Sequence, residues 1–398
     1  MAALLAVGLL AGGCSSLPRE PTVPEAMIHE AVVPGMGTEI RSWGGMLNPE
    51  FKQEMIESVN RERALQAAAG QTGPLPPADF LALSGGGANG AFGAGLLCGW
   101  TAAGNRPQFK LVTGVSTGAL MAPFVFAGPD YDNVLRILYT QTTTKDIAIK
   151  RGLVTAIFSD AMYDNAPLRA LVAKYMDAKL LAAIAREYRK GRLLIIATTD
   201  LDAGRAVLWN VGAIACYGDE QALNLVRSIM VASAAIPGVF PPVMIEVEAQ
   251  GQRFQEMHVD GGAMTQVFLY PPSVKVVETA AAAGFHPRVR RAYIIRNSKI
   301  APEWAQVDRS LLPIAGRAVD SLIQTQGVGD LYRTYANTQR DGIDFNLAYI
   351  PDSFAAEPAG LFDKAYMKQL FDLGYEMARH GYPWLKLPPY FEVPDTKQ

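Results

Sequence analysis

Lys110-Leu-Val-Thr-Gly-Val-Ser-Thr-Gly118 is the stretch that decides the fold. Residues 109–112 predict a short apolar strand, and the apolar run after the stretch predicts a helix. Between them, Gly114 and Gly118 flank Ser116 in a Gly-x-Ser-x-Gly pattern. Small flanking residues permit a tight strand-to-helix turn that presents a serine hydroxyl, and the N-terminus of the next helix can stabilise an oxyanion. The stretch therefore predicts an α/β fold with Ser116 as nucleophile, and a chance match in a glycine-rich chain is the alternative.

A second strand-turn-helix unit lies just upstream. Residues 80–84 predict a buried strand and residues from Ala91 onward a helix. The turn between them consists of Gly85, Gly86, Gly87, Ala88, Asn89 and Gly90. Consecutive glycines can aim several amide groups into one concavity that binds an anion. A dinucleotide-binding fingerprint and a P-loop both lack their further residues here, so the turn predicts an oxyanion hole beside Ser116. Glycines that serve only helix packing are the alternative.

A candidate base follows much later in the chain. Residues 254–259 predict a strand that ends in Asp260, Gly261 and Gly262, where the glycines let the carboxylate approach another backbone closely. An Asp-Gly turn without a catalytic role is the alternative. A free carboxylate, with a pKa of about 3.9, is a weak base toward a serine hydroxyl. We therefore expect burial in the cleft to raise the pKa of Asp260.

Two histidines compete with Asp260 for the role of base. His258 shares the strand face of Asp260 but is about 7 Å back along the strand. His286 lies in a loop before the predicted strand 291–296 and would complete a Ser116, Asp260, His286 triad in the chain order of α/β-hydrolase esterases. This triad is the alternative to a Ser/Asp dyad.

The three glycine-flanked motifs, taken in this order, resemble those of the patatin-like phospholipase family. The resemblance also covers residues 160–169, 197–205 and 232–242 and spans about residues 79–300. It implies a three-layer α/β/α fold with a mainly parallel central sheet. It also implies a serine acyl hydrolase that cleaves carboxylic esters of lipids through a Ser116–Asp260 dyad and an acyl-enzyme, with the turn 85–90 as oxyanion hole. The family usually has Arg or Lys where this chain has Asn89, which leaves head-group preference and rate open.

The N-terminus has the features of a targeting segment. Residues 2–10 are apolar apart from Gly8, too few to span a bilayer, and residues 10–14 resemble a bacterial lipobox that ends in Cys14. We expect residues 1–13 to be a lipoprotein signal peptide and Cys14 to carry the lipid. Two features depart from this pattern: no Lys or Arg precedes the apolar run, and Ala11 stands where leucine is usual. By analogy, Ser15 favours the bacterial outer membrane, and without lipidation the protein would be secreted or periplasmic.

The rest of the chain is assigned to three further regions. Residues 14–77 are predicted to be a linker with one helix, 49–69, and residues 78–300 the catalytic domain. Residues 301–398 are predicted to be a helical extension packed on the same domain, with helices at 311–338 and 361–380. The apolar stripe of the last helix predicts core packing, and a membrane-contacting face is the alternative.

Composition narrows the possible partners. The chain has 398 residues, of which 49% are hydrophobic and 19% charged, with a net charge of −2 that gives no indication of nucleic-acid binding. Its three cysteines and four histidines form no pair at metal-ligand spacing, so we predict no metal, no cofactor and no disulfide framework.

Asp200 and Asp202 are predicted turn residues, with a cation site as alternative. The expected partners are a lipid substrate and a membrane surface, and a non-catalytic lipid-binding envelope lipoprotein is the competing function.

Overall fold

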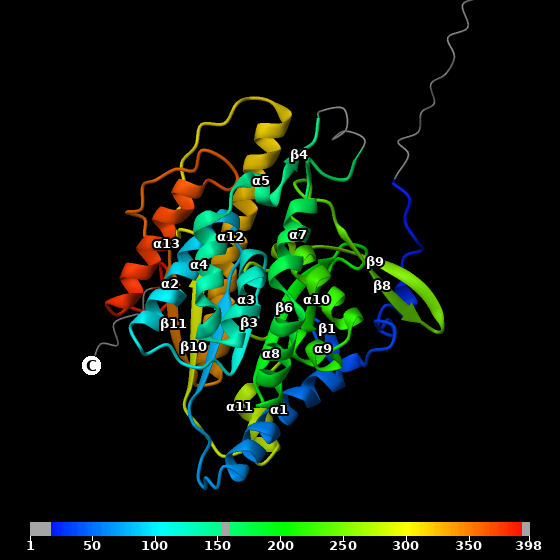
Figure 1. Ribbon diagram of the computed structural model, residues 1–398, viewed down its shortest axis with the longest axis vertical. Helices are drawn as coiled ribbons and strands as arrows, with labels where there is room; N and C mark the ends of the chain where they lie inside the picture. The colour runs from blue at the N-terminus through cyan, green and yellow to red at the C-terminus, as the bar shows by residue number, and fades with distance from the viewer. Residues whose placement is uncertain (1–16, 153–158, 392–398) are drawn as a thin grey trace, which may run out of the picture.

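A nine-stranded sheet forms the centre of the computed structural model, which describes residues 17–152 and 159–391 (Figure 1). Its strands lie in the order β1-β7-β6-β3-β2-β10-β11, and β9 pairs with β6 and with β8. The five from β6 to β11 in this order are parallel to one another, as the sequence predicted for the sheet centre. The strands are β1 (Arg41–Trp43), β2 (Ala78–Leu83), β3 (Leu111–Gly114), β6 (Leu193–Asp200), β7 (Arg205–Asn210), β8 (Val243–Ala249), β9 (Gln252–Asp260), β10 (Arg290–Arg296) and β11 (Asp344–Tyr349).

Helices cover both faces of this sheet and complete a three-layer α/β/α fold. Strands β2, β3 and β6 are buried along their whole length, which explains their continuous apolar sequences. One helical layer holds α2 (Gly90–Ala102), α3 (Thr117–Ala127), α4 (Asp132–Gln141), α7 (Ala166–Tyr175), α8 (Ala178–Arg189), α9 (Val211–Tyr217), α10 (Glu220–Ser233) and α13 (Lys364–Arg379) (Figure 1). The other face is covered by α1 (Pro49–Ala68), α11 (Val276–Ala282) and α12 (Leu311–Arg340).

The N-terminal segment contributes more to the fold than the predicted linker and helix. Strand β1 pairs with β7 at the sheet edge, and Val32 forms a bridge with Glu248 of β8. Ile40 and Leu47 are buried in the main core. Helix α1 has nearly the predicted bounds because the Asn48 side chain accepts the Phe51 amide as its N-cap and Pro49 occupies the first turn.

The C-terminal segment adds a strand and a helix to the same core. Strand β11, which the sequence analysis did not predict, pairs in parallel with β10. Helix α13 packs directly on α2, where Gly95 and Gly99 face its backbone so closely that an added Cβ would overlap the carbonyls of Phe371 and Tyr375. The apolar stripe of α13 is buried, so the prediction of core packing is confirmed and the alternative of a membrane-contacting face on this helix is wrong.

The predictions for the first residues fall outside the described part of the chain. The expected signal peptide, residues 1–13, and the expected lipidation site, Cys14, both belong to this region. Among the helices of residues 17–152 and 159–391, none combines the length and the apolar character that crossing a membrane requires.

Candidate active site

Ser116 occupies a sharp turn between β3 and α3. Its φ of 53° and ψ of −124° are unusual for a residue with a side chain, and such strain is concentrated at functional sites. The flanking glycines are required because an added Cβ on Gly114 would lie 2.6 Å from the Gly118 carbonyl oxygen, and one on Gly118 would overlap that of Leu83. The backbone thus presents the serine hydroxyl at the carboxyl edge of the parallel strands.

Ser233, at the end of α10, fixes this turn from a neighbouring element. The Ser116 amide donates a 3.0 Å hydrogen bond to Ser233 Oγ, whose hydroxyl donates to the Ala197 carbonyl at 2.7 Å. Ser233 is fully buried. Its hydroxyl therefore links the strained turn to the centre of β6.

Asp260 lies beside Ser116 because β9 ends against β6. Thr198 pairs with Asp260 in this short antiparallel contact, and the Asp260 amide donates to the Ala235 carbonyl at 2.9 Å. The Gly262 amide donates to Asp260 Oδ1 at 2.7 Å. Gly261 allows the turn to approach β6, since an added Cβ would lie 2.6 Å from the Ala197 carbonyl oxygen.

Burial gives the Asp260 carboxyl the proton affinity of a base. Its removal from water raises the pKa from 3.8 to about 7, against the contacts with the Ser116 hydroxyl and the Gly262 amide, which lower it. A pKa near neutrality suits a group that takes and returns a proton at physiological pH. The expectation that burial raises this pKa is confirmed.

The glycine turn follows β2 and lies against the serine. Gly86 and Gly87 have positive φ values of 145° and 54°, which side chains rarely adopt. An added Cβ on Gly85 would lie 3.3 Å from Ser116 Cβ. The Gly85 amide already donates to the Gln266 carbonyl at 3.0 Å, so the amides of Gly86 and Gly87 are the stronger candidates for oxyanion donors.

Two residues that the sequence analysis missed hold the glycine turn in place. Asn297, just after β10, donates from its backbone to Ser84 Oγ and from its side chain to the Ser84 carbonyl, at 2.8 and 3.0 Å. Gln266 accepts the Gly85 amide, and its side chain donates to the Gly262 carbonyl at 2.8 Å. Gln266 therefore connects the glycine turn to the turn after Asp260. No local motif marks either residue, because both act through contacts with distant segments.

Asn89, the position where the resembled family usually has a basic residue, pairs with the C-terminal helix. Tyr366 of α13 donates a 2.7 Å hydrogen bond from its hydroxyl to Asn89 Oδ1. Burial raises the pKa of Tyr366 to about 12, so this hydroxyl keeps its proton. The neutral pair of Asn89 and Tyr366 thus occupies the position at which the resembled family usually has a positively charged side chain.

An apolar pocket begins beside the nucleophile. Its lining comes from α3, α4, α7, α10 and the start of α13 and includes Thr117, Leu120, Leu138, Val172, Met230 and Met367. Thr117 follows Ser116 directly, and its hydroxyl is bonded to that of Tyr139 at 2.8 Å. The lining suits a hydrocarbon group, but Ser116 is not part of it and the cavity volume of about 60 Å³ is much smaller than a long acyl chain.

His286 lies near the amino ends of the parallel strands, whereas Ser116 lies at their carboxyl ends. It precedes β10, whose first residue Arg290 pairs with Ala78 at the start of β2. Ser116 follows the far end of the parallel strand β3, and a seven-residue strand spans about 20 Å. The structure therefore contradicts the alternative in which His286 completes a Ser/Asp/His triad.

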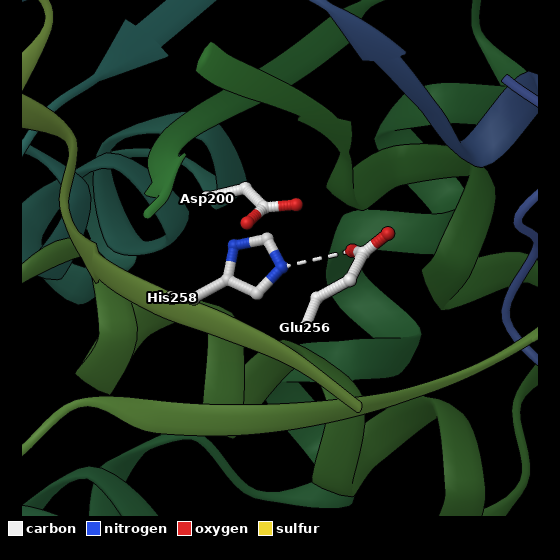
Figure 2. A group of neighbouring side chains, drawn as sticks. All are labelled: Asp200, Glu256 and His258. Atoms are coloured by element: carbon white, nitrogen blue, oxygen red, sulfur yellow. Dashed lines mark hydrogen bonds and ion pairs between the residues drawn. The ribbon is translucent and has the colours of Figure 1, made fainter. Parts of the chain in front are cut away.

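His258 is also unavailable as a base, because it belongs to a buried hydrogen-bonded chain (Figure 2). Trp209 donates to Thr198 Oγ1 at 2.8 Å, and Thr198 Oγ1 lies 2.9 Å from His258 Nδ1. On the other side of the ring, His258 Nε2 lies 3.1 Å from Glu256 Oε2. Both ring nitrogens are engaged.

Asp200, Glu256 and His258 bring possible metal-ligand atoms within 4.8 Å of one another. Each of these side chains, however, already has hydrogen-bonding partners within the protein. Arg41 donates to both oxygens of Glu256, at 2.7 and 2.9 Å. Burial alone would raise the pKa of Glu256, but Arg41 and His258 lower it to about 2. Asp200 accepts the amides of Asp202 and Ala203, as expected of a turn residue. The guanidinium occupies the position at Glu256 where a cation would bind.

Comparison with family models gives a match that contains Ser116, Asp260 and the glycine turn. The family model described as Patatin-like phospholipase matches residues 81–270. A comparison with curated proteins found no significant match. Among solved structures, VipD from Legionella pneumophila aligns with 77% of this chain and 67% of its own, at a TM-score of 0.38 and 11% identity. That likeness is too distant to inform the roles of individual residues.

Proposed function

We propose, since residues 81–270 form a patatin-like phospholipase domain, that this acyl hydrolase uses Ser116 as nucleophile and Asp260 as its only side-chain base. The observation that carries the proposal is the contact between a serine on a strained turn and a buried carboxyl whose pKa is about 7. The substrate class that we propose is a carboxylic ester of a lipid, which is supported by the match to the patatin-like phospholipase model and is compatible with the apolar lining beside Thr117.

The proposed reaction has two halves. In the first, Ser116 Oγ attacks the ester carbonyl carbon while its proton passes to Asp260, and the carbonyl oxygen gains negative charge facing the amides of Gly86 and Gly87. Collapse breaks the ester bond, and Asp260 gives the proton to the departing alcohol. In the second, Asp260 takes a proton from water, the hydroxide attacks the acyl-enzyme, and Ser116 regains its proton as the fatty acid leaves.

The test compares hydrolysis of p-nitrophenyl esters by the chain from Ser16 onward and by Ser116→Ala, Asp260→Asn and His286→Ala variants. We expect the first two to lose at least about a thousandfold in kcat/KM, which is the scale of removing a nucleophile or its base. His286→Ala is the matched control and should keep full activity, because its side chain lies at the opposite edge of the sheet.

Two results would contradict the dyad. Loss of activity in His286→Ala, with folding intact by circular dichroism, would restore a histidine to the mechanism. Absence of turnover in every form, together with retained binding to lipid vesicles, would instead favour a non-catalytic lipid-binding protein. Chain-length preference among active forms would narrow the acyl group that the pocket accepts.

We also propose that residues 1–13 are a lipoprotein signal peptide and that the protein resides in the bacterial envelope through lipidated Cys14. The support is the sequence pattern alone: a short apolar run followed by small residues and a cysteine. Mass spectrometry of the protein purified from membranes would detect the lipid on Cys14. A Cys14→Ser protein that remains equally membrane-bound would contradict this assignment.

A further inference from the structure

The N-terminal half of α12 extends past the carboxyl ends of the parallel strands, where Ser116 lies. The helix runs antiparallel to the parallel strands, because it connects the end of β10 to the start of β11. Its 30 residues span about 45 Å, whereas the six residues of β11 span about 20 Å. The helix meets the strand ends at Gln324, whose side chain accepts from Arg296 at 3.0 Å. Residues 311–323 therefore extend about 20 Å farther (Figure 1).

This projecting half is amphipathic: Arg317, Asp320 and Ser321 share one face of the helix, and the apolar side chains lie on the other faces. It has two charged residues, Arg317 and Asp320, in thirteen positions. Leu311 is 81% and Leu322 69% exposed, and Trp304 in the preceding loop is 88% exposed. Ile314 and Val319 are also exposed. The apolar face of an amphipathic helix is normally buried, and exposed apolar surface of this kind marks an interaction site.

A second apolar feature lies at the same end of the molecule. The short antiparallel pair of β4 (Ile149–Lys150) and β5 (Tyr163–Asp164) exposes Ile149 and its neighbour Met162 by 56% and 50%. Figure 1 shows β4 at the end of the molecule where α12 begins. The apolar side chains thus flank the edge of the sheet that carries the candidate site.

We propose that the loop and helix of residues 304–323 dock the protein on a phospholipid bilayer. An amphipathic helix lies in the membrane interface with its apolar face buried about 5–10 Å deep, so the polar face and the charged Asp308 and Arg309 just before the helix can stay among the head groups. Trp304 is of the residue type that favours the membrane interface, and the long Arg317 side chain can reach the head groups. The orientation rests on the proposed function, because docking at this edge brings the lipid ester to Ser116. A second copy bound to the same helix would instead obstruct that route.

The test uses vesicles of phosphatidylethanolamine and phosphatidylglycerol with the chain from Ser16 onward. A Leu311→Ser/Leu322→Ser variant should lose at least about tenfold in vesicle flotation and in fatty-acid release from vesicles. Its hydrolysis of a soluble p-nitrophenyl ester should stay within about twofold of the parent, because neither leucine contacts the site. Val289→Ser is the matched control: Val289 is 63% exposed but lies at the opposite edge, before β10.

Tryptophan fluorescence gives an independent readout. Trp304 should shift to shorter wavelength when vesicles are added, and Trp304→Phe should abolish the shift, since Trp100 and Trp209 are buried in the core and Trp43 and Trp384 are packed against it. Unchanged flotation of the double variant would overturn the proposal, as would a dimer that the same substitutions dissociate in the absence of lipid binding. If flotation depends on the leucines but no form hydrolyses any ester, docking stands and the proposed function fails.

Discussion

At the scale of single residues, the chemistry depends on keeping one carboxyl buried. In the proposed dyad, Asp260 must be ionised to accept the serine proton, and burial holds its pKa at about 7. The same burial makes ionisation costly for the folded state. Catalysis and stability therefore place opposite demands on this residue, and both can be measured as a function of pH.

The pH profile of kcat/KM should report the ionisation of Asp260. We expect activity on a soluble ester to be constant above about pH 8 and to fall about tenfold per unit well below pH 7, because only the carboxylate acts as base. Release of p-nitrophenol should be recorded at a wavelength where its absorbance is independent of pH. A rate that stays constant down to pH 5, in protein that remains folded, would exclude Asp260 as the base.

Asp260→Asn should stabilise the protein while inactivating it. The folded-state pKa lies above the ordinary value of 3.8, so the wild type loses stability as pH rises from about 4 through about 7. By linkage this loss is at most about 4 kcal/mol at pH 8. Asparagine cannot ionise, and its Oδ1 can still accept the Gly262 amide. Urea unfolding of the variant and the wild type at pH 8 and pH 4 checks this prediction. If Asp260→Asn raised the free energy of unfolding as much at pH 4 as at pH 8, ionisation of Asp260 would not be the cause.

At the scale of elements, the contact between α2 and α13 positions the glycine turn. Helix α2 continues directly from that turn, and α13 supplies Tyr366 to Asn89. The two helices can approach because Gly95 and Gly99 have no side chain where the α13 backbone passes. A helix outside residues 81–270 thus helps to set the candidate oxyanion hole.

Gly95→Ala should therefore be strongly destabilising. The added methyl group would overlap the Phe371 carbonyl, and such overpacking against backbone costs about 3 kcal/mol. Gly329→Ala, in α12, is the matched control because nothing lies within 4 Å of its added Cβ. It should be neutral or stabilising by about 0.5–1 kcal/mol, from helix propensity. Thermal unfolding of both variants measures the difference, and equal melting temperatures would show that α13 yields to the methyl group.

The sequence analysis predicted the elements that contain a recognisable short motif. The turns at Ser116, at the glycines and at Asp260 carry their glycines in adjacent positions, and the adjoining strands are apolar along their length. Ser233, Gln266 and Asn297 escaped prediction because each supports the site through contacts with segments that are distant in the sequence. Strand β11 escaped because a six-residue strand between two long helices gives a weak pattern.

At the scale of the whole molecule, the domain does not end where its family match ends. Strands β10 and β11 extend the sheet beyond residue 270, and β1 extends the other side before residue 81. Asp330 of α12 accepts the Gln266 amide at 2.6 Å and so supports the turn after Asp260 from outside the match. The match covers the catalytic motifs, whereas the hydrophobic core is continuous from the N-terminal segment to α13.

A chain ending at residue 300 should consequently fail to fold. It would expose the glycine face of α2 and leave β10 as an open sheet edge, a template for aggregation. We expect it to be insoluble, or to lack near-ultraviolet circular dichroism, when the chain from Ser16 to Gln398 is soluble and cooperative. A soluble, active protein of residues 17–300 would show that the C-terminal segment is dispensable.

The packing of α13 on α2 also has a consequence for the order of events during synthesis. Helix α2 forms from residues made early, but the helix that covers it is completed only at Arg379, about 280 residues after the end of α2 at Ala102. A nascent chain therefore carries every catalytic motif long before the glycine turn has its final support. Nascent chains that end before Arg379 should therefore lack hydrolase activity, although they already carry Ser116 and Asp260.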